Sequence, residues 1–209
     1  MADIHKLIAK LQKLYPDAKY ELDFQTPFQL LIATVLAAQC TDERVNRVTA
    51  TLFPRYPDPA AFVAADLAEL EQALQPTGFF RQKARAVQAI CKELLERFGG
   101  QVPARMEDLV TLPGVARKTA NVVLTTAFGI ASGIVVDTHV SRVSQRLGLV
   151  ARDEKASADK IEQELMRLVP KSQWRFFGPA LVLHGRYTCT ARKPDCAGCG
   201  LREGCEQKL

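Results

Sequence analysis

The chain has 209 residues, of which 47% are hydrophobic and 24% charged, a composition that is ordinary for a globular protein. Its longest apolar run, Leu30 to Ala38, is too short to span a bilayer, and its N-terminal stretch lacks the apolar block of a signal peptide. We therefore expect a cytoplasmic protein with no membrane partner. The net charge of +5 is concentrated in 170–209, with seven Lys or Arg against three acidic residues, and in 79–105, with six against two, which favours a nucleic-acid partner.

Nearly every segment has the 3.6-residue period of a helix, and no alternating strand pattern is seen in the sequence. The expected helices, in chain order, cover 1–15, 28–39, 42–52, two short stretches that start after Asp58 and Asp66 and end by Pro76, then 82–98, 106–112, 115–128, 138–147, 155–168 and 172–187. Thr26, Thr41 and Asp137 are expected N-caps, and Pro54 is expected to end a helix. The predicted fold class is all-α.

Residues 112–120 read Leu-Pro-Gly-Val-Ala-Arg-Lys-Thr-Ala and predict a tight turn between two helices. Pro113 cannot continue the first helix, and Gly114 tolerates the unusual φ that such a turn needs. The second helix begins with backbone N–H groups at which a phosphate could bind, those of Gly114, Val115 and Ala116. Arg117 and Lys118 add positive charge there. Taken alone, such a turn is more often a structural connection with a solvated lysine.

Four of the six cysteines lie in the last 21 residues, with the pattern Cys-x6-Cys-x2-Cys-x5-Cys. They are Cys189, Cys196, Cys199 and Cys205. This density in a cytosolic protein points to metal rather than to disulfides. Four-thiolate zinc sites usually have two Cys-x2-Cys pairs and this tail has one, so an iron–sulfur cluster is favoured, with zinc and structural disulfides as alternatives.

Four further residues can be interpreted without any family. Arg192 and Lys193 lie between the first two tail cysteines, where they either face a phosphate backbone or only keep the loop solvated. Cys40 and Cys91 lie in apolar-rich segments and are expected to be small core residues.

Three features together resemble the endonuclease III family: the hairpin with Lys118, the Val-Asp-Thr-His of Val136 to His139, and the cysteine spacing. Further matches are Ala-Gln-Cys-Thr-Asp at 38–42, Thr-Gly-Phe-Phe at 77–80 and Lys-Ala at 83–84, so the resemblance covers almost the whole chain. Members of this family are DNA glycosylase/lyases of the helix-hairpin-helix superfamily that carry a [4Fe-4S] cluster. The resemblance implies base excision repair of oxidised pyrimidines in duplex DNA.

The resemblance also implies two helical domains. A six-helix barrel would cover 22–131, with its helix-hairpin-helix at about 106–128. A discontinuous domain of 1–21 plus 132–209 would carry the [4Fe-4S] cluster on the four tail cysteines. Lys118 and Asp137 would face a cleft between the domains, into which a damaged nucleotide is flipped out of the DNA.

In the implied chemistry, neutral Lys118 attacks C1′ of the flipped nucleotide, displaces the base and forms a Schiff base with the opened sugar. β-Elimination then cuts the strand on the 3′ side of the lesion. Asp137 would accept the proton of the amine and stabilise positive charge on the sugar. Read without the family, Asp137 is a helix N-cap, and the two roles can coexist.

The resemblance places Gln39 in the gap left by the flipped nucleotide and Phe79 as an apolar wedge, although Phe79 can equally be a core aromatic. His139 is expected to be a structural or phosphate-facing residue. The full set of expected DNA contacts is Gln39, Phe79, Arg81, Pro113, Gly114, Val115, Ala116, Arg117, His139, Arg192 and Lys193. The expected partner is double-stranded DNA with damaged pyrimidines or abasic sites, bound by a monomer at the nucleoid.

The sequence departs from the family pattern in two places. Ala116 stands where the family usually has a second glycine, and the connector at 131–133 is one residue longer before Asp137. These departures leave open a weakly active or non-cutting damage-binding member of the same fold. A mismatch adenine glycosylase relative shares the cysteine pattern, but such proteins usually lack the lysine found here at 118.

Overall fold

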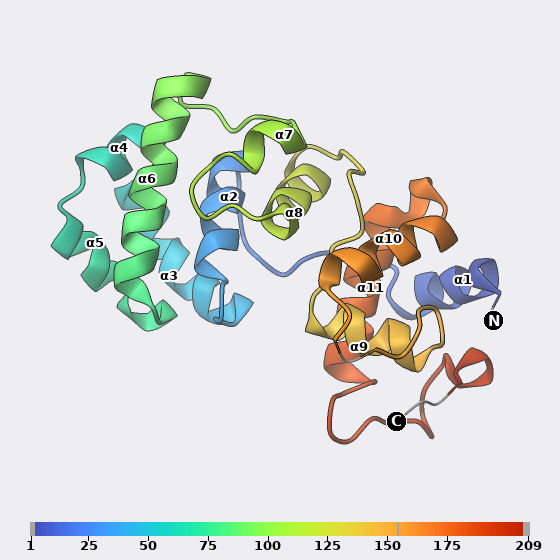
Figure 1. Ribbon diagram of the computed structural model, residues 1–209. Helices are drawn as coiled ribbons and strands as arrows, with labels where there is room; N and C mark the ends of the chain where they lie inside the picture. The colour runs from blue at the N-terminus through green and yellow to red at the C-terminus, as the bar shows by residue number, and fades with distance from the viewer. Residues whose placement is uncertain (1–2, 154, 207–209) are drawn as a thin grey trace. The chain divides into compact units, whose positions relative to one another are not determined.

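The structure is a computed structural model that describes residues 3–153 and 155–206 (Figure 1). Regular secondary structure in these ranges is helical, with no strand, so the predicted all-α class is confirmed. None of the helices in the described ranges has the length and apolar character needed to cross a membrane. The chain divides into two compact units, of which the central one is Glu21–Ile130 and the other combines the chain before and after it.

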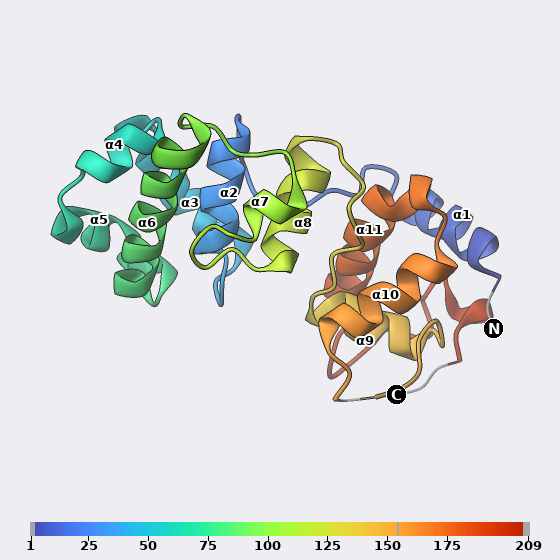
Figure 2. The same cartoon turned by 45° about the horizontal axis from the view of Figure 1, so that its top comes forward.

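The central unit begins with the helices α2, Pro27–Leu36, and α3, Asp42–Arg55. They are followed by α4, Pro59–Ala64, α5, Leu67–Leu74, the 3-10 turn η1, Gln75–Thr77, and the long helix α6, Phe80–Phe98. The unit ends with α7, Met106–Leu109, and α8, Arg117–Ala127. Helices α4 and α5 pack along α6, while α2 packs against α8 and α3 (Figures 1 and 2). Its core includes the fully buried Phe62, Leu31 and Ile90.

Side-chain caps explain where several of these helices begin. The Thr26 hydroxyl accepts the Gln29 N–H at 3.2 Å, and the Thr41 hydroxyl accepts the Arg44 N–H at 3.4 Å, as predicted. Asp58 caps α4 in the same way, with its Oδ1 2.8 Å from the Ala61 nitrogen. Because these caps are local, their positions are readable from the sequence.

Several helix boundaries in this unit differ from the prediction. Helix α2 ends at Leu36 instead of residue 39. Helix α3 continues through Pro54 to Arg55, because Pro54 is its penultimate residue and the missing N–H weakens only the last turn. Helix α6 begins at Phe80, two residues early, and α7 and α8 are shorter around the hairpin than expected.

The other unit contains α1, Ile4–Leu14, α9, Thr138–Arg146, α10, Ala158–Leu168, η2, Lys171–Gln173, α11, Trp174–Tyr187, and η3, Arg202–Gly204. Helix α11 packs against α9 and α1, and its Phe177 is buried among Leu11, Val143 and Leu165. Asp3 caps α1, and positions 1 and 2 of the expected first helix lie outside the described residues. Helix α10 starts after the Ser157 cap, not at residue 155.

Candidate functional site

The hairpin of the central unit has the predicted turn but a different set of backbone donors. Gly114 has φ 74°, a conformation that favours glycine. The Val115 N–H donates to the Leu112 carbonyl at 3.1 Å, and both side chains are buried. This N–H therefore closes the turn, and the expectation that it points towards an anion is wrong. Ala116 is the N-cap of α8, with φ −79° and ψ 165°, a region open to any residue, so its methyl group causes no backbone strain.

Lys118 lies in the first turn of α8, and its side chain is exposed, as are those of Ala116 and Arg117. Arg117 and Lys118 lie at the N-terminal end of α8, where the helix dipole is positive. This arrangement suits a phosphate group. The hairpin thus presents an amine and a cationic helix end to solvent.

Gln39 and Phe79 are the only non-glycine residues in the described ranges with a left-handed backbone, at φ 54° and φ 49°. Each such residue costs of order 1–3 kcal/mol and persists only where the surroundings hold it. Phe79 is 58% exposed, so the interpretation of this residue as a core aromatic is wrong. Gln39 is exposed as well, in the turn that follows α2. Both strained residues therefore present their side chains to solvent.

Lys83 in α6 belongs to the Lys-Ala match with the family, and the sequence alone indicates no role for it. Its side chain is only 5% exposed, and its Nζ lies 2.8 Å from the Leu36 carbonyl and 2.8 Å from the Thr77 carbonyl. Desolvation by burial lowers the pKa of the Lys83 ammonium, with an opposing effect from Cys40. Lys83 is thus not part of a basic surface, although it contributes to the charge surplus of 79–105.

Arg81 and the two other cysteines lie in the same unit. The Arg81 side chain is exposed and lies 3.8 Å from a carboxylate oxygen of Glu71. Cys91 is buried in α6, as predicted. Cys40 is only half-buried and follows the end of α2, so the expectation that it is a small core residue is wrong.

In the other unit, Asp137 is the N-cap of α9, as predicted. Its Oδ1 accepts the N–H groups of His139 and Val140, each at 2.8 Å. Within the described ranges no hydrogen bond reaches its second oxygen, Oδ2. The carboxylate therefore caps the helix with one oxygen and keeps the other available as a proton acceptor.

His139 lies half-buried in the first turn of α9. Its Nδ1 is 3.3 Å from a guanidinium nitrogen of Arg142, and Arg142 also donates to the Gly185 and Cys189 carbonyls. Burial lowers the pKa of Arg142 and the neighbouring Arg146 lowers it further. His139 is therefore part of the packing between α9 and α11. Lys118 and Asp137 belong to different compact units of the chain.

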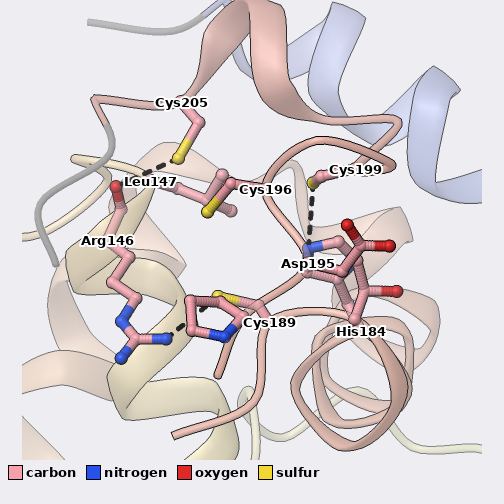
Figure 3. Close-up of a pocket in the computed structure, with 10 residues that line it drawn as sticks. Arg146, Leu147, His184, Cys189, Asp195, Cys196, Cys199 and Cys205 are labelled. Carbon is pink, nitrogen blue, oxygen red and sulfur yellow. Dashed lines mark hydrogen bonds between the residues drawn. The ribbon is translucent and has the colours of Figure 1, made fainter. Parts of the chain in front are cut away.

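The four tail cysteines line one pocket (Figure 3). Arg146, Leu147 and His184 complete much of its wall, and burial lowers the pKa of His184 to about 4. None of the six cysteines forms a disulfide, which removes the disulfide alternative for this structure. No three His, Cys, Asp or Glu side chains of the described residues converge closely enough for a single metal ion. Four thiols around one pocket are the kind of donor set that iron–sulfur clusters use in proteins.

Arginines of α9 hold the loop that begins at Cys189. Arg146 donates to the Thr190 carbonyl at 2.8 Å and to the Ala191 carbonyl at 2.9 Å, and one of its nitrogens lies 3.4 Å from Cys189 Sγ. The Thr190 hydroxyl donates to the Lys193 carbonyl at 2.7 Å. The side chains of Arg192 and Lys193 are exposed on this braced loop.

Reasoning from the sequence missed Lys83, Arg142, Arg146 and His184. Each makes at least one contact with a residue 15 or more positions away, for example Arg146 with Cys189 and His184 with Cys199. The four-residue spacing of Arg142 and Arg146 places both on one helix face, which is the only local signal for them.

Comparisons with known proteins agree with this arrangement. The sequence pattern of the HhH-GPD superfamily base excision DNA repair proteins matches residues 32–171. The endonuclease III of Synechocystis sp. is 54% identical over 96% of this chain and 90% of its own length. The endonuclease III of Escherichia coli K12 is 40% identical over 97% of this chain and 94% of its own.

A solved structure of a non-covalent endonuclease III–DNA complex superimposes with a TM-score of 0.92 at 44% identity, covering 98% of this chain and 94% of that one. The superfamily pattern spans more than half of the chain, and the relatives match over nearly their whole length. The chain therefore belongs to the HhH-GPD superfamily of base excision DNA repair proteins and, within it, to the endonuclease III family.

Proposed function

We propose that this protein is a base-excision-repair DNA glycosylase that removes oxidised pyrimidines from duplex DNA and then cuts the strand by β-elimination. The observation that carries the proposal is the full-length match to endonuclease III, together with an exposed lysine in the first turn after the hairpin. A solved endonuclease III trapped as a covalent intermediate with DNA, at 44% identity and a TM-score of 0.92, supports covalent chemistry.

Lys118 is the nucleophile. Its neutral amine attacks C1′, the bond from C1′ to the base breaks with its electron pair on the base, and the base leaves as an anion that takes a proton from water. The sugar ring opens as the amine nitrogen forms a Schiff base with C1′; loss of a C2′ proton then breaks the C3′–O bond and cuts the strand. An amine attacks only in its neutral form, and the exposed Lys118 side chain is accessible to bound DNA.

Asp137 is the proton acceptor. Its Oδ1 is committed to the N–H groups of His139 and Val140, and Oδ2 takes up the proton that the attacking amine releases. The negative charge also stabilises positive charge on the sugar as the base departs. Capping α9 fixes the orientation of the carboxylate, so its role as proton acceptor depends on its role as helix cap.

The DNA contacts fall into three groups. The hairpin binds the phosphate backbone through Pro113, Gly114, Ala116 and Arg117. Gln39 and Phe79 enter the duplex, and Arg81, near the start of α6, also contacts DNA. His139 and the loop cations Arg192 and Lys193 bind further phosphates. His139 and Pro113 are half-buried, and the other residues of these groups are exposed.

Cys189, Cys196, Cys199 and Cys205 hold a [4Fe-4S] cluster in this proposal, one thiolate for each iron. The four thiols line the same pocket, and the Arg146 guanidinium near Cys189 Sγ offers a hydrogen bond to a thiolate. When bound, the cluster supplies cross-links that fix the loop carrying Arg192 and Lys193. Metal analysis and visible absorption of the purified protein distinguish iron from zinc.

The two compact units correspond in this proposal to the two domains of the family, the barrel at 22–131 and the cluster domain at 1–21 plus 132–209. In this proposal the protein acts as a monomer. It works in the cytoplasm, on the DNA of the nucleoid, because its substrate lies there.

The alternative is a damage-binding protein of the same fold that cuts weakly or not at all. Two observations favour it: the Ala116 methyl stands at the phosphate-binding turn, and the Val115 N–H is already used within that turn. A mismatch adenine glycosylase activity is disfavoured by Lys118, because such enzymes release the base without a lysine nucleophile.

Borohydride trapping tests the proposal. Borohydride reduces a Schiff base between enzyme and sugar to a stable cross-link, which is measured on duplexes that carry an oxidised pyrimidine or an abasic site. We expect trapping on both duplexes, loss of trapping in Lys118→Gln, and no loss in Lys92→Gln, a matched exposed lysine of α6. Trapping on neither duplex, with DNA binding intact, would establish the non-cutting alternative.

A further inference from the structure

We propose that Lys83 is a positioning residue for lesion recognition: its buried ammonium ties the end of α2 to the end of η1 and holds Gln39 and Phe79 in place. The inference rests on the proposed function, since it assumes that these two side chains enter DNA.

The ammonium joins two chain segments that are distant in sequence. Its Nζ donates to the carbonyl of Leu36, the last residue of α2, and to that of Thr77, the last residue of η1, both at 2.8 Å. Carbonyls at the C-terminal end of a helix have no helical N–H partner and carry negative partial charge. A cation with several N–H donors matches two such carbonyls at once.

Each bonded carbonyl lies just before a strained residue. Leu36 precedes Gln39 by three positions, and Thr77 precedes Phe79 by two. These two are the residues with φ 54° and φ 49°, the only left-handed non-glycine residues in the described part of the chain. In addition, the Lys83 backbone N–H donates to the Phe79 carbonyl at 3.0 Å. The backbone of Lys83 thus binds the turn at Phe79, and its side chain binds the segments before both strained residues.

Burial indicates that the charge has a specific purpose. Lys83 is 5% exposed, and a buried ammonium is costly unless it is well hydrogen-bonded. An apolar side chain of similar length could fill the same space, but it would leave the two carbonyls unpaired and the two turns unconnected. The exposed Phe79 and Gln39 side chains would then lose their fixed positions while the core of the unit stays packed.

The proposal therefore predicts a defect that depends on the substrate. An oxidised cytosine paired with guanine must be unpaired and unstacked before it reaches the enzyme, whereas an abasic nucleotide offers little resistance. Lys83→Met should slow base release from the paired lesion at least tenfold and slow strand cutting at an abasic site less than threefold. A role confined to stability would affect both substrates equally.

The experiment compares wild-type protein, Lys83→Met and Lys92→Met in single-turnover assays on both duplexes. Lys92 is a matched control on the same helix, with its side chain 68% exposed. A 2-aminopurine next to the lesion reports opening of the duplex, and thermal melting confirms that each variant is folded. We expect the fluorescence increase on binding in wild-type protein and Lys92→Met and its loss in Lys83→Met.

Equal rates and equal fluorescence for folded Lys83→Met and wild-type protein would overturn the inference, as would an equal loss on both duplexes. If Lys83→Met does not fold, Lys83→Gln replaces it, because its shorter amide reaches at most one of the two carbonyls and should give the same substrate-dependent defect. Wild-type protein that is inactive on both duplexes would instead refute the proposed function, on which the inference rests.

Discussion

Asp137 offers a test in which the structural and the chemical role of one carboxylate are separated. Asp137→Asn keeps an oxygen that can accept the His139 and Val140 N–H groups, but it cannot take up a proton as a base does. Asp137→Ala removes both functions. Ser157→Ala is the matched control, because the Ser157 hydroxyl caps α10 by accepting the Lys160 N–H at 3.2 Å.

The expected magnitudes follow from the cap geometry. Loss of an N-cap costs about 1 kcal/mol and up to about 2 kcal/mol, so we expect Asp137→Ala to lower the free energy of unfolding by about 1–2 kcal/mol. Asp137→Asn should lose only the attraction between the carboxylate and the helix dipole, about 0.3–1 kcal/mol. Each kcal/mol corresponds to roughly 2–4 °C in Tm for a chain of this size.

Base release should respond differently from stability. A positioned general base contributes about 10²- to 10⁴-fold, so Asp137→Asn and Asp137→Ala should both slow base release by at least about 100-fold. Ser157→Ala should lose stability like Asp137→Ala and keep the wild-type rate. Thermal melting and single-turnover release of an oxidised pyrimidine measure the two effects. Near-wild-type activity of folded Asp137→Asn would refute the assigned role, and wild-type stability of Asp137→Ala would refute the cap.

Four further outcomes are expected. Ala116→Gly should raise the free energy of unfolding by about 0.5–1 kcal/mol, because glycine is the better N-cap, and should tighten duplex binding in a titration; a weaker complex would contradict the steric reading of the methyl group. Phe79→Gly should leave stability unchanged or raise it by up to about 1 kcal/mol, because glycine favours φ 49°, while slowing base release. Burial raises the pKa of Cys91 from 9.0 to about 12, so the unfolded thiol ionises first and stability should fall between pH 9 and 12, by at most about 1.4 kcal/mol per pH unit. Denaturant unfolding of Cys91→Ala should lack that share of the pH dependence. Arg192→Ala and Lys193→Ala should each reduce the salt slope of DNA binding by about 1, and an unchanged slope would mean that the side chain contacts no phosphate.

Helix starts were readable from the sequence where a side chain acts on its own neighbourhood. Thr26, Thr41 and Asp137 cap the helices that they were predicted to cap, since each needs only an oxygen within three residues of the first free N–H groups. Helix ends were less readable. Helix α2 ends three residues early, before the left-handed Gln39, and Phe79 sets the start of α6.

Those two boundaries were not readable because their cause lies elsewhere in the chain. Nothing in the sequence around Gln39 or Phe79 favours a positive φ in a non-glycine residue. The hydrogen bonds of Lys83 reach the carbonyl of Leu36 across 47 positions of sequence, and local propensity carries no signal of that contact. The prediction that the Val115 N–H is unpaired was wrong for a related reason. The closure of the hairpin turn depends on the packing of Leu112 and Val115, which the local sequence does not show.

The sequence by itself determined the all-α class, the hairpin with Lys118, the Asp137 cap and the four-cysteine set, because each depends on periodicity or on spacing within a short stretch. Only the tertiary structure decided which groups support them. Lys83 donates to carbonyls next to the two strained turns, and Arg146 donates to a carbonyl of the cysteine loop. A buried cation is stable only where folding brings carbonyl oxygens to it, and those oxygens come from segments that the sequence keeps far apart.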